Sequence, residues 1–174
     1  MANNIFSVPI NPKLDPEFIK TEYLQFLIRN KDLIYDLYFT SRMPPFTQDA
    51  MGDVFYSQDM EYQCIDMALW LSKESGIPLS ATFNNIYVRP DQKNLELWIN
   101  NFESLYNAGI KIVTLPHTSW LLTGEIQKQY PDLYIKNTIL REVTRPNEVI
   151  DLARAGFNYI NLDRDLMRDR DRLN

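Results

Sequence analysis

A glycine that closes a helical stretch and is followed at once by a short apolar run is the feature that most constrains this fold. The pattern occurs at Gly76, Gly109 and Gly156, and the apolar runs that follow are 77–83, 110–115 and 157–162. Glycine adopts the left-handed conformation that ends a helix at no steric cost. A short apolar run bounded by turn residues is typical of a buried strand. The sequence therefore predicts a helix followed by a strand at three places.

Two further strands complete the expected series. Pro131 stops a helix directly before the run 133–137, because proline cannot continue a helix. The earliest expected strand is Leu33 to Phe39, after a helix at about Pro16 to Arg29. The segments between strands carry apolar residues at helical spacing, namely Cys64, Met67, Ala68 and Leu71; Leu95, Ile99, Phe102 and Leu105; and Val149, Leu152 and Ala153. Since parallel strands need crossover connections that are usually helices, this alternation predicts an α/β fold with parallel strands.

The length of the chain limits how much of a barrel it can form. A closed eight-stranded TIM barrel needs about 200 to 250 residues, whereas this chain has 174. We therefore predict one (β/α) domain over residues 1–174, a partial TIM-type (β/α) barrel of about five strands. Three arrangements fit: a truncated gene product, a half-barrel completed by oligomerisation, and an open doubly wound sheet.

Composition restricts the partners and the compartment. The net charge of −5 provides no general positive field for a polyanion, so direct nucleic-acid binding is not expected. Residues 1–12 have neither the basic start nor the long apolar run of a signal peptide, and no stretch approaches the length of a membrane span. We expect a cytoplasmic protein that makes no contact with membrane.

The chain has one cysteine, Cys64, and one histidine, His117. A site that needs several thiolate or imidazole ligands therefore cannot be assembled from this chain alone. Cys64 lies on the apolar stripe of its helix and is expected in the core. Oxygen sites for magnesium or manganese remain open, because the chain has 23 acidic residues.

Ligands bind at the carboxyl ends of the strands in parallel α/β folds, so the residues there are the candidates for a site. They are Thr40, Ser41 and Arg42; Asn84 and Asn85; His117, Thr118 and Ser119; Asn137, Arg141 and Glu142; and Asn161, Asp163 and Arg164. Together, these side chains form either a ligand site or a rim in which the polar groups hydrogen-bond to one another. We predict a site in which arginine holds an anionic group, asparagine fixes orientation, and His117 or Asp163 moves a proton. The predicted substrate-binding residues are Arg42, Asn84, Asn137, Arg141 and Asn161.

Two common enzyme signatures are absent from the sequence. Ser41 and Ser119 lack the Gly-x-Ser-x-Gly context of a hydrolase nucleophile, and no glycine-rich phosphate loop is present. The segment 41–59 is long for a connection between strand and helix, which is typical of a lid or of an irregular surface loop. The alternating charges of 163–172 are typical of a solvated helix face.

The segment Ile160 to Leu166, preceded by Asn137 to Glu142 and by Ala155-Gly156, resembles the collagenase-like peptidase family, peptidase family U32. The resemblance covers mainly Leu79 to the C-terminus. It implies a TIM-like barrel and a role in proteolysis, or in the hydroxylation of RNA or quinone precursors. The hydroxylation-related members carry a cysteine cluster for an iron-sulfur centre downstream of the matched region, and this chain has only Cys64. The resemblance therefore implies no cofactor within this chain, and an iron-sulfur cluster only where a downstream region supplies the cysteines.

Three functional hypotheses follow. In the leading one the chain is the N-terminal part of a U32-like barrel with a ligand site at the strand ends. In the second it is a non-catalytic oligomeric module, because an unclosed sheet presents an edge that pairs with a second copy or with a missing half-barrel. In the third it is a divalent-metal barrel enzyme with His117, Glu142 and Asp163 as ligands. The aromatic content of 13% fits either contact surfaces or, as we favour, a large aromatic core.

Overall fold

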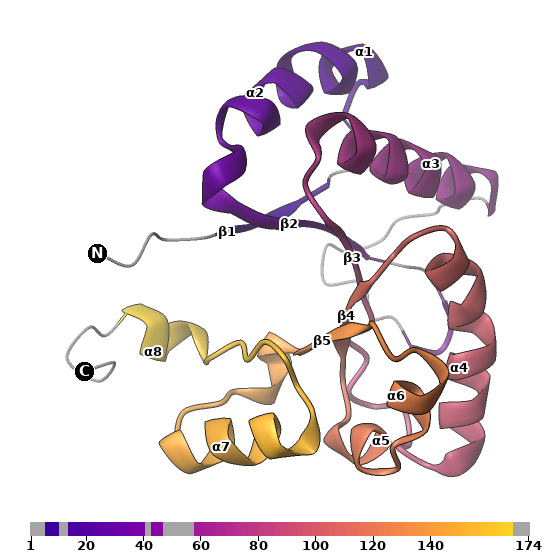
Figure 1. Ribbon diagram of the computed structural model, residues 1–174, viewed down its shortest axis with the longest axis vertical. Coiled ribbons are helices and arrows are strands. Elements are labelled where there is room, and N and C mark those ends of the chain that lie inside the picture. Colours follow the sequence, from indigo (N-terminus) through magenta and orange to yellow (C-terminus); the bar gives the residue numbers. More distant parts are fainter. Residues whose placement is uncertain (1–5, 11–13, 41–42, 47–57, 169–174) are drawn as a thin grey trace. The chain divides into compact units, whose positions relative to one another are not determined.

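Five strands alternate with helices, and their order in the sheet follows the chain, β1-β2-β3-β4-β5. The computed structural model describes residues 6–10, 14–40, 43–46 and 58–168. Side chains are described for these residues except 58–64 and 167–168. The strands are β1 (Phe6–Pro9), β2 (Ile34–Thr40), β3 (Leu79–Thr82), β4 (Ile112–Leu115) and β5 (Tyr134–Asn137) (Figure 1). The chain divides into two compact units, residues 1–42 with 49–81 and residues 43–48 with 82–174.

The first unit begins with the helical region predicted between Pro16 and Arg29. It consists of α1 (Pro16–Phe18), a π-helical turn η1 (Ile19–Tyr23) and α2 (Leu24–Arg29), followed by the 3₁₀ turn η2 (Lys31–Leu33). Asp15 starts α1, because its carboxylate accepts a hydrogen bond from the Phe18 amide at 2.9 Å. Pro16 follows at the first helical position, where its missing N–H costs nothing. In this unit α2 packs against the long helix α3 (Gln58–Ser75) (Figure 1).

Taking Leu33 to Phe39 as the earliest strand was wrong, because β1 precedes it. The two strands pair in parallel, with Val8 opposite Leu37. β1 has four mostly exposed residues and ends at Pro9. A short strand without alternation and with a terminal proline carries no periodic signal, and only its pairing with β2 identifies it.

The second unit holds β4 and β5, which pair in parallel with Val113 opposite Ile135. Its helices are α4 (Gln92–Asn107), α5 (Thr118–Leu122), α6 (Glu125–Gln129), the 3₁₀ turn η3 (Ile139–Arg141), α7 (Pro146–Ala155) and α8 (Arg164–Arg168) (Figure 1). The glycines that close α4 and α7, Gly109 and Gly156, have φ angles of 102° and 108°. Together with Gly76 at 67° after α3, they confirm the helix-closing role predicted for all three.

An aromatic cluster forms the core of the second unit. Trp98 of α4 is fully buried and stacks on Phe102 with ring centroids 4.8 Å apart. The edges of Phe83 and Tyr130 meet Trp98 at 5.5 and 6.5 Å, and Trp120 of α5 lies 6.4 Å away. The buried residues of α4 are Leu95, Trp98, Phe102 and Leu105, whereas Ile99, which shares their helical spacing, is half-buried. The interpretation of the aromatic content as a core is confirmed for this unit.

The strand predicted at 157–162 is not formed as a strand. Its only ladder contact among the described residues is a parallel bridge between Lys136 and Tyr159. The side chain of Asn158 accepts a hydrogen bond from the Ile135 amide at 2.8 Å, in place of a backbone carbonyl. Asparagine side chains compete in this way with backbone ladders. The apolar run therefore lies beside β5 but is held partly by side chains.

In the part of the chain that the structure describes, no helix combines the length and the apolar character needed to cross a membrane.

Candidate functional site

In the second unit, the carboxyl ends of β3, β4 and β5 lead to Asn84, His117 and Asn137. Asn84 and His117 are half-buried, whereas Asn137 is fully buried at the end of β5. Arg42, predicted to bind substrate after β2, lies outside the described residues, as does most of the loop 41–59. The predicted burial of Cys64 also concerns a side chain outside the described set.

His117 occupies the turn between β4 and α5. The imidazole lies close enough to the backbone of Val88 for a hydrogen-bonding effect on its pKa. Its Nε2 atom is buried and has no hydrogen-bond partner among the described residues. The imidazole also meets the Trp120 ring edge-on, with centroids 5.2 Å apart. A buried acceptor without a partner is costly and rare in folded proteins, so this atom requires an explanation.

The pKa of the His117 imidazole lies below its ordinary value of 6.5, because burial disfavours the charged ring. The positive charge of Arg141 acts in the same direction, and the hydrogen-bonding effect of the Val88 backbone opposes both. At neutral pH the ring is therefore uncharged. A neutral imidazole with an unoccupied Nε2 can accept a proton or a hydrogen bond.

Arg141 is the last residue of η3, after β5, and its side chain is exposed. Its guanidinium charge acts on His117 and also on Glu148 of α7. The backbone amides of Thr144 and Arg145 each donate to Glu148 Oε2 at 2.9 Å, and they hold the pKa of this carboxyl below its usual range. Because Glu148 is already bonded to the backbone, the exposed guanidinium of Arg141 can receive an anionic group.

Asn137 and Asn161 form a reciprocal pair. The Asn137 amide accepts from the Asn161 backbone N–H at 2.5 Å and donates to the Asn161 carbonyl at 3.0 Å. The Asn161 amide donates to the Asn137 carbonyl at 2.6 Å. These three bonds continue the parallel pairing one step beyond the Lys136 to Tyr159 bridge, with side chains in place of part of the backbone ladder. In this part of the rim, the polar groups of the two asparagines satisfy one another's hydrogen-bonding needs.

Asp163 begins α8. Its Oδ1 atom accepts hydrogen bonds from the amides of Asp165 and Leu166 at 2.9 and 3.3 Å, which is the arrangement of a helix N-cap. The Asp163 amide donates to the Val143 carbonyl at 2.9 Å. The carboxylate is therefore engaged in holding the turn into α8.

Asn85 has a larger part in the geometry than the sequence indicated. Its side-chain oxygen accepts from the Tyr87 amide at 3.1 Å and its side-chain nitrogen donates to the Pro45 carbonyl at 2.6 Å. Its backbone amide donates to the Phe46 carbonyl at 3.1 Å. The signal available in the sequence was the preference of asparagine for the first position of a turn, which does not reveal a partner 40 residues away.

His117, Glu142 and Asp163 do not form the ligand set that a divalent-metal enzyme requires. Within the described ranges, no three His, Cys, Asp or Glu side chains are grouped so that they could hold a metal ion. The third hypothesis therefore has no support from the geometry of its three named residues.

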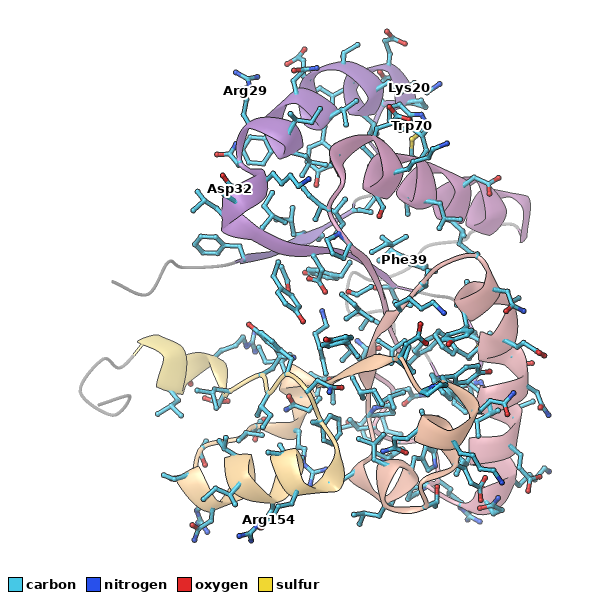
Figure 2. The ribbon with its side chains drawn as sticks, in the orientation of Figure 1. Lys20, Arg29, Asp32, Phe39, Trp70 and Arg154 are labelled. Carbon is cyan, nitrogen blue, oxygen red and sulfur yellow. The ribbon has the colours of Figure 1, made fainter. Side chains whose placement is uncertain are left out.

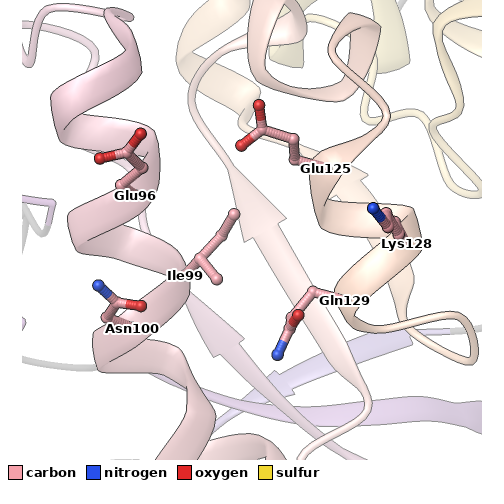
Figure 3. Close-up of a pocket in the computed structure, with 6 residues that line it drawn as sticks. All are labelled: Glu96, Ile99, Asn100, Glu125, Lys128 and Gln129. Atoms are coloured by element: carbon pink, nitrogen blue, oxygen red, sulfur yellow. The ribbon is translucent and has the colours of Figure 1, made fainter.

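A groove between α4 and α6 lies in the helical layer of the second unit. It has a volume of about 380 Å³ and is lined by Glu96, Ile99 and Asn100 of α4 and by Glu125, Lys128 and Gln129 of α6 (Figure 3). The Gln92 side chain donates to Glu96 at 3.1 Å and to Glu125 at 3.0 Å, which links the two carboxylates. None of the predicted site residues lines this groove.

The sequence matches no protein-family model, and no curated protein matches it. Solved structures do resemble it. A putative phosphonomutase from Burkholderia cenocepacia J2315 aligns with a TM-score of 0.54 and 12% identity, covering 83% of this chain and 59% of that one. A putative lyase/mutase from the same organism aligns with a TM-score of 0.52 and 15% identity, covering 83% and 50%. The U32 peptidase Mk0906 aligns with a TM-score of 0.54 and 12% identity, covering 95% and 62%.

At these identities the similarity concerns the fold alone, and this chain spans 50% to 62% of the length of the three structures. The predicted fold class is confirmed: parallel strands alternate with helices in an open, partial α/β barrel, and a U32 peptidase is among the proteins that share it.

Proposed function

We propose that this chain is part of an α/β-barrel enzyme related to the U32 peptidases, and that it binds an anionic substrate at the carboxyl ends of β3, β4 and β5. The observation that carries the proposal is the buried Nε2 atom of His117, which has no partner among the described residues although it lies where barrel enzymes bind their ligands. A proton acceptor kept neutral by burial is suited to general base catalysis.

Arg141 supplies the second half of the proposed site. Its exposed guanidinium acts on the same imidazole, and arginine binds carboxylate and phosphonate groups with paired hydrogen bonds. In this arrangement Arg141 holds the anionic group, His117 Nε2 takes a proton from the adjoining atom of the substrate, and Asn84 fixes the orientation of the substrate. Asn137, Asn161 and Asp163 support the rim, since their polar atoms bond the backbone.

Two of the structures that share the fold suggest which anionic groups to test. The name phosphonomutase implies a substrate whose anionic group is a phosphonate. The anionic group of a peptide is its C-terminal carboxylate. One guanidinium can bind either group. The binding of one or the other of two probe ligands distinguishes a phosphonate substrate from a peptide substrate.

Arg141→Ala is expected to weaken the binding of an anionic probe by about tenfold or more, because a hydrogen-bonded ion pair is lost. The binding is measured on the full chain by the NMR signals of His117, which are unambiguous because the chain has one histidine. The probes are phosphonoacetate, the dipeptide glycylglycine and inorganic phosphate. Binding of phosphonoacetate favours a phosphonate substrate, and binding of glycylglycine favours a peptide.

Arg154→Ala is the matched control, because Arg154 is an exposed arginine on the outer face of α7 (Figure 2). Its ion pair with Asp151 is long, at 4.0 Å. This variant should bind the probes like the wild-type protein. The proposal fails if none of the three probes shifts the His117 signals, or if Arg141→Ala and Arg154→Ala bind equally well.

A further inference from the structure

Four aromatic rings that can lose an electron form a row through the second unit, namely Trp120, Trp98, Tyr130 and Tyr106. The Trp120 ring lies 5.2 Å from the His117 ring and 6.4 Å from that of Trp98, measured between centroids. Trp98 lies 6.5 Å from Tyr130, which lies 4.6 Å from Tyr106. The first three rings are buried, whereas Tyr106 is half-buried. The row therefore runs from the candidate site to the surface.

Both tryptophans of the row carry a buried indole N–H that has no hydrogen-bond partner among the described residues. A buried donor left unpaired is costly, and a redox role is one reason for its presence. An indole that loses an electron becomes a radical cation, and a base bonded to its N–H would take the proton and trap the radical on that ring. Trp98 and Trp120 have no such base within the described ranges. Because a positive charge is also costly in an apolar core, the oxidation passes on to a neighbouring ring.

The proton acceptors of the two tyrosines determine where the row ends, because tyrosine gives up an electron readily only when its phenolic proton also leaves. The Tyr130 hydroxyl donates to the Ile99 backbone carbonyl at 2.7 Å, and a carbonyl is not a base. Burial raises the pKa of the Tyr130 phenol to about 12, so this ring keeps its proton. The Tyr106 hydroxyl donates to the exposed carboxylate of Asp132, which is a base. Tyr106 is therefore the ring on which the oxidation comes to rest.

Lys111 favours the loss of this proton. Its ammonium nitrogen lies 3.0 Å from the centroid of the Tyr106 ring and 3.3 Å from Asp132 Oδ2. The ammonium charge disfavours a second positive charge on the Tyr106 ring, so an oxidised Tyr106 must become neutral by releasing its proton. The Tyr106 hydroxyl donates to Asp132 Oδ1, the other oxygen of the same carboxylate. One carboxylate therefore faces the ammonium and is also placed to take the phenolic proton.

We infer that the row is a path for electrons that repairs one-electron oxidation beside the candidate site. A radical oxidant that reaches the site removes an electron from the Trp120 indole and is itself reduced. Trp98 refills Trp120, and Tyr106 refills Trp98 through the interposed ring of Tyr130. The phenolic proton of Tyr106 moves to Asp132. The products are two intact indoles, a neutral tyrosyl radical and a protonated carboxylate, and this path does not depend on the proposed function.

The test is flash photoionisation of the full chain carrying Trp70→Phe, with light that tryptophan absorbs and tyrosine does not, and with nitrate to take up the ejected electron. Trp98 and Trp120 are then the remaining tryptophans, since the chain has three. The tryptophanyl absorption is expected to decay as the tyrosyl absorption grows, at a rate that does not depend on protein concentration. Tyr106→Phe removes one hydroxyl and is expected to abolish this growth. Trp98→Phe keeps a ring that is not oxidised and is expected to abolish most of it.

Tyr87→Phe is the matched control, because Tyr87 is a tyrosine of the same unit that lies outside the row and is 78% exposed. It should leave the growth of the tyrosyl absorption unchanged. Asp132→Asn retains an oxygen that can accept from the Tyr106 hydroxyl but removes the base, so it should slow the growth. An unchanged rate in Asp132→Asn overturns the role of Asp132 as proton acceptor. Growth that depends on protein concentration, or wild-type growth in a folded Tyr106→Phe or Trp98→Phe protein, overturns the path itself.

Discussion

Replacing Trp98 with alanine is expected to lower the free energy of unfolding by about 3–5 kcal/mol, the cost typical of truncating a buried aromatic side chain. Trp98 is fully buried and contacts four aromatic rings, those of Phe83, Phe102, Trp120 and Tyr130. Its removal leaves a cavity in the centre of the second unit that these rings can fill only in part. Urea unfolding followed by tryptophan fluorescence and by circular dichroism measures the change.

Two variants test whether the loss of stability comes from the packing of the buried Trp98 ring. Trp98→Phe keeps a ring and removes an indole N–H that has no partner among the described residues, so it should cost less than about 1.5 kcal/mol. Leu97→Ala alters the neighbouring, exposed residue of the same helix and should cost less than about 1 kcal/mol. A similar loss for Trp98→Ala and Leu97→Ala would contradict the central place of Trp98 in the core.

Asn137→Ala is expected to lower the free energy of unfolding by about 2–4 kcal/mol. The substitution removes two hydrogen bonds to Asn161 and leaves the Asn161 amide and carbonyl without their partners in a part-buried position. Each unsatisfied buried group costs about 1–3 kcal/mol. Denaturant unfolding is again the measurement, and the loss should exceed that of Asn161→Ala, which removes one bond at 2.6 Å.

The double variant tests whether the two asparagines act as one unit. Residues in one hydrogen-bond network have non-additive effects, so the loss in Asn137→Ala with Asn161→Ala should be smaller than the sum of the two single losses. Asn94→Ala removes an exposed amide that donates to the Arg89 carbonyl at 2.9 Å, and it should cost about 1 kcal/mol or less. Additive losses, or an Asn137→Ala loss no larger than that of Asn94→Ala, would show that the pair does not hold the end of β5.

The regular parts of the fold were predictable because local rules determine them. The positive φ angles of Gly76, Gly109 and Gly156 follow from the helix-closing role of glycine, and the helix from Pro16 follows from Asp15 and Pro16 at its start. β1 was missed because its pairing with β2 is a long-range property. The run at 157–162 was taken as a strand because its apolar pattern does not reveal that Asn137, Asn158 and Asn161 replace backbone partners.

The position of the candidate site in the fold was predictable from the sequence, but the contacts within the site were not. The rule for strand ends led to His117 and Arg141, whereas no signal in the sequence indicated the contact of the His117 ring with Trp120. No periodic pattern links these residues. The predictions of a single domain, of an oligomer and of a cytoplasmic location stay predictions.

The most direct test of the account is a pH titration of the His117 ring nitrogens by NMR in the wild-type protein. We predict a titration midpoint below 6.5, because burial disfavours the charged ring. The protein then holds a neutral base at pH 7. A midpoint at or above 6.5 would contradict the proposed role of His117.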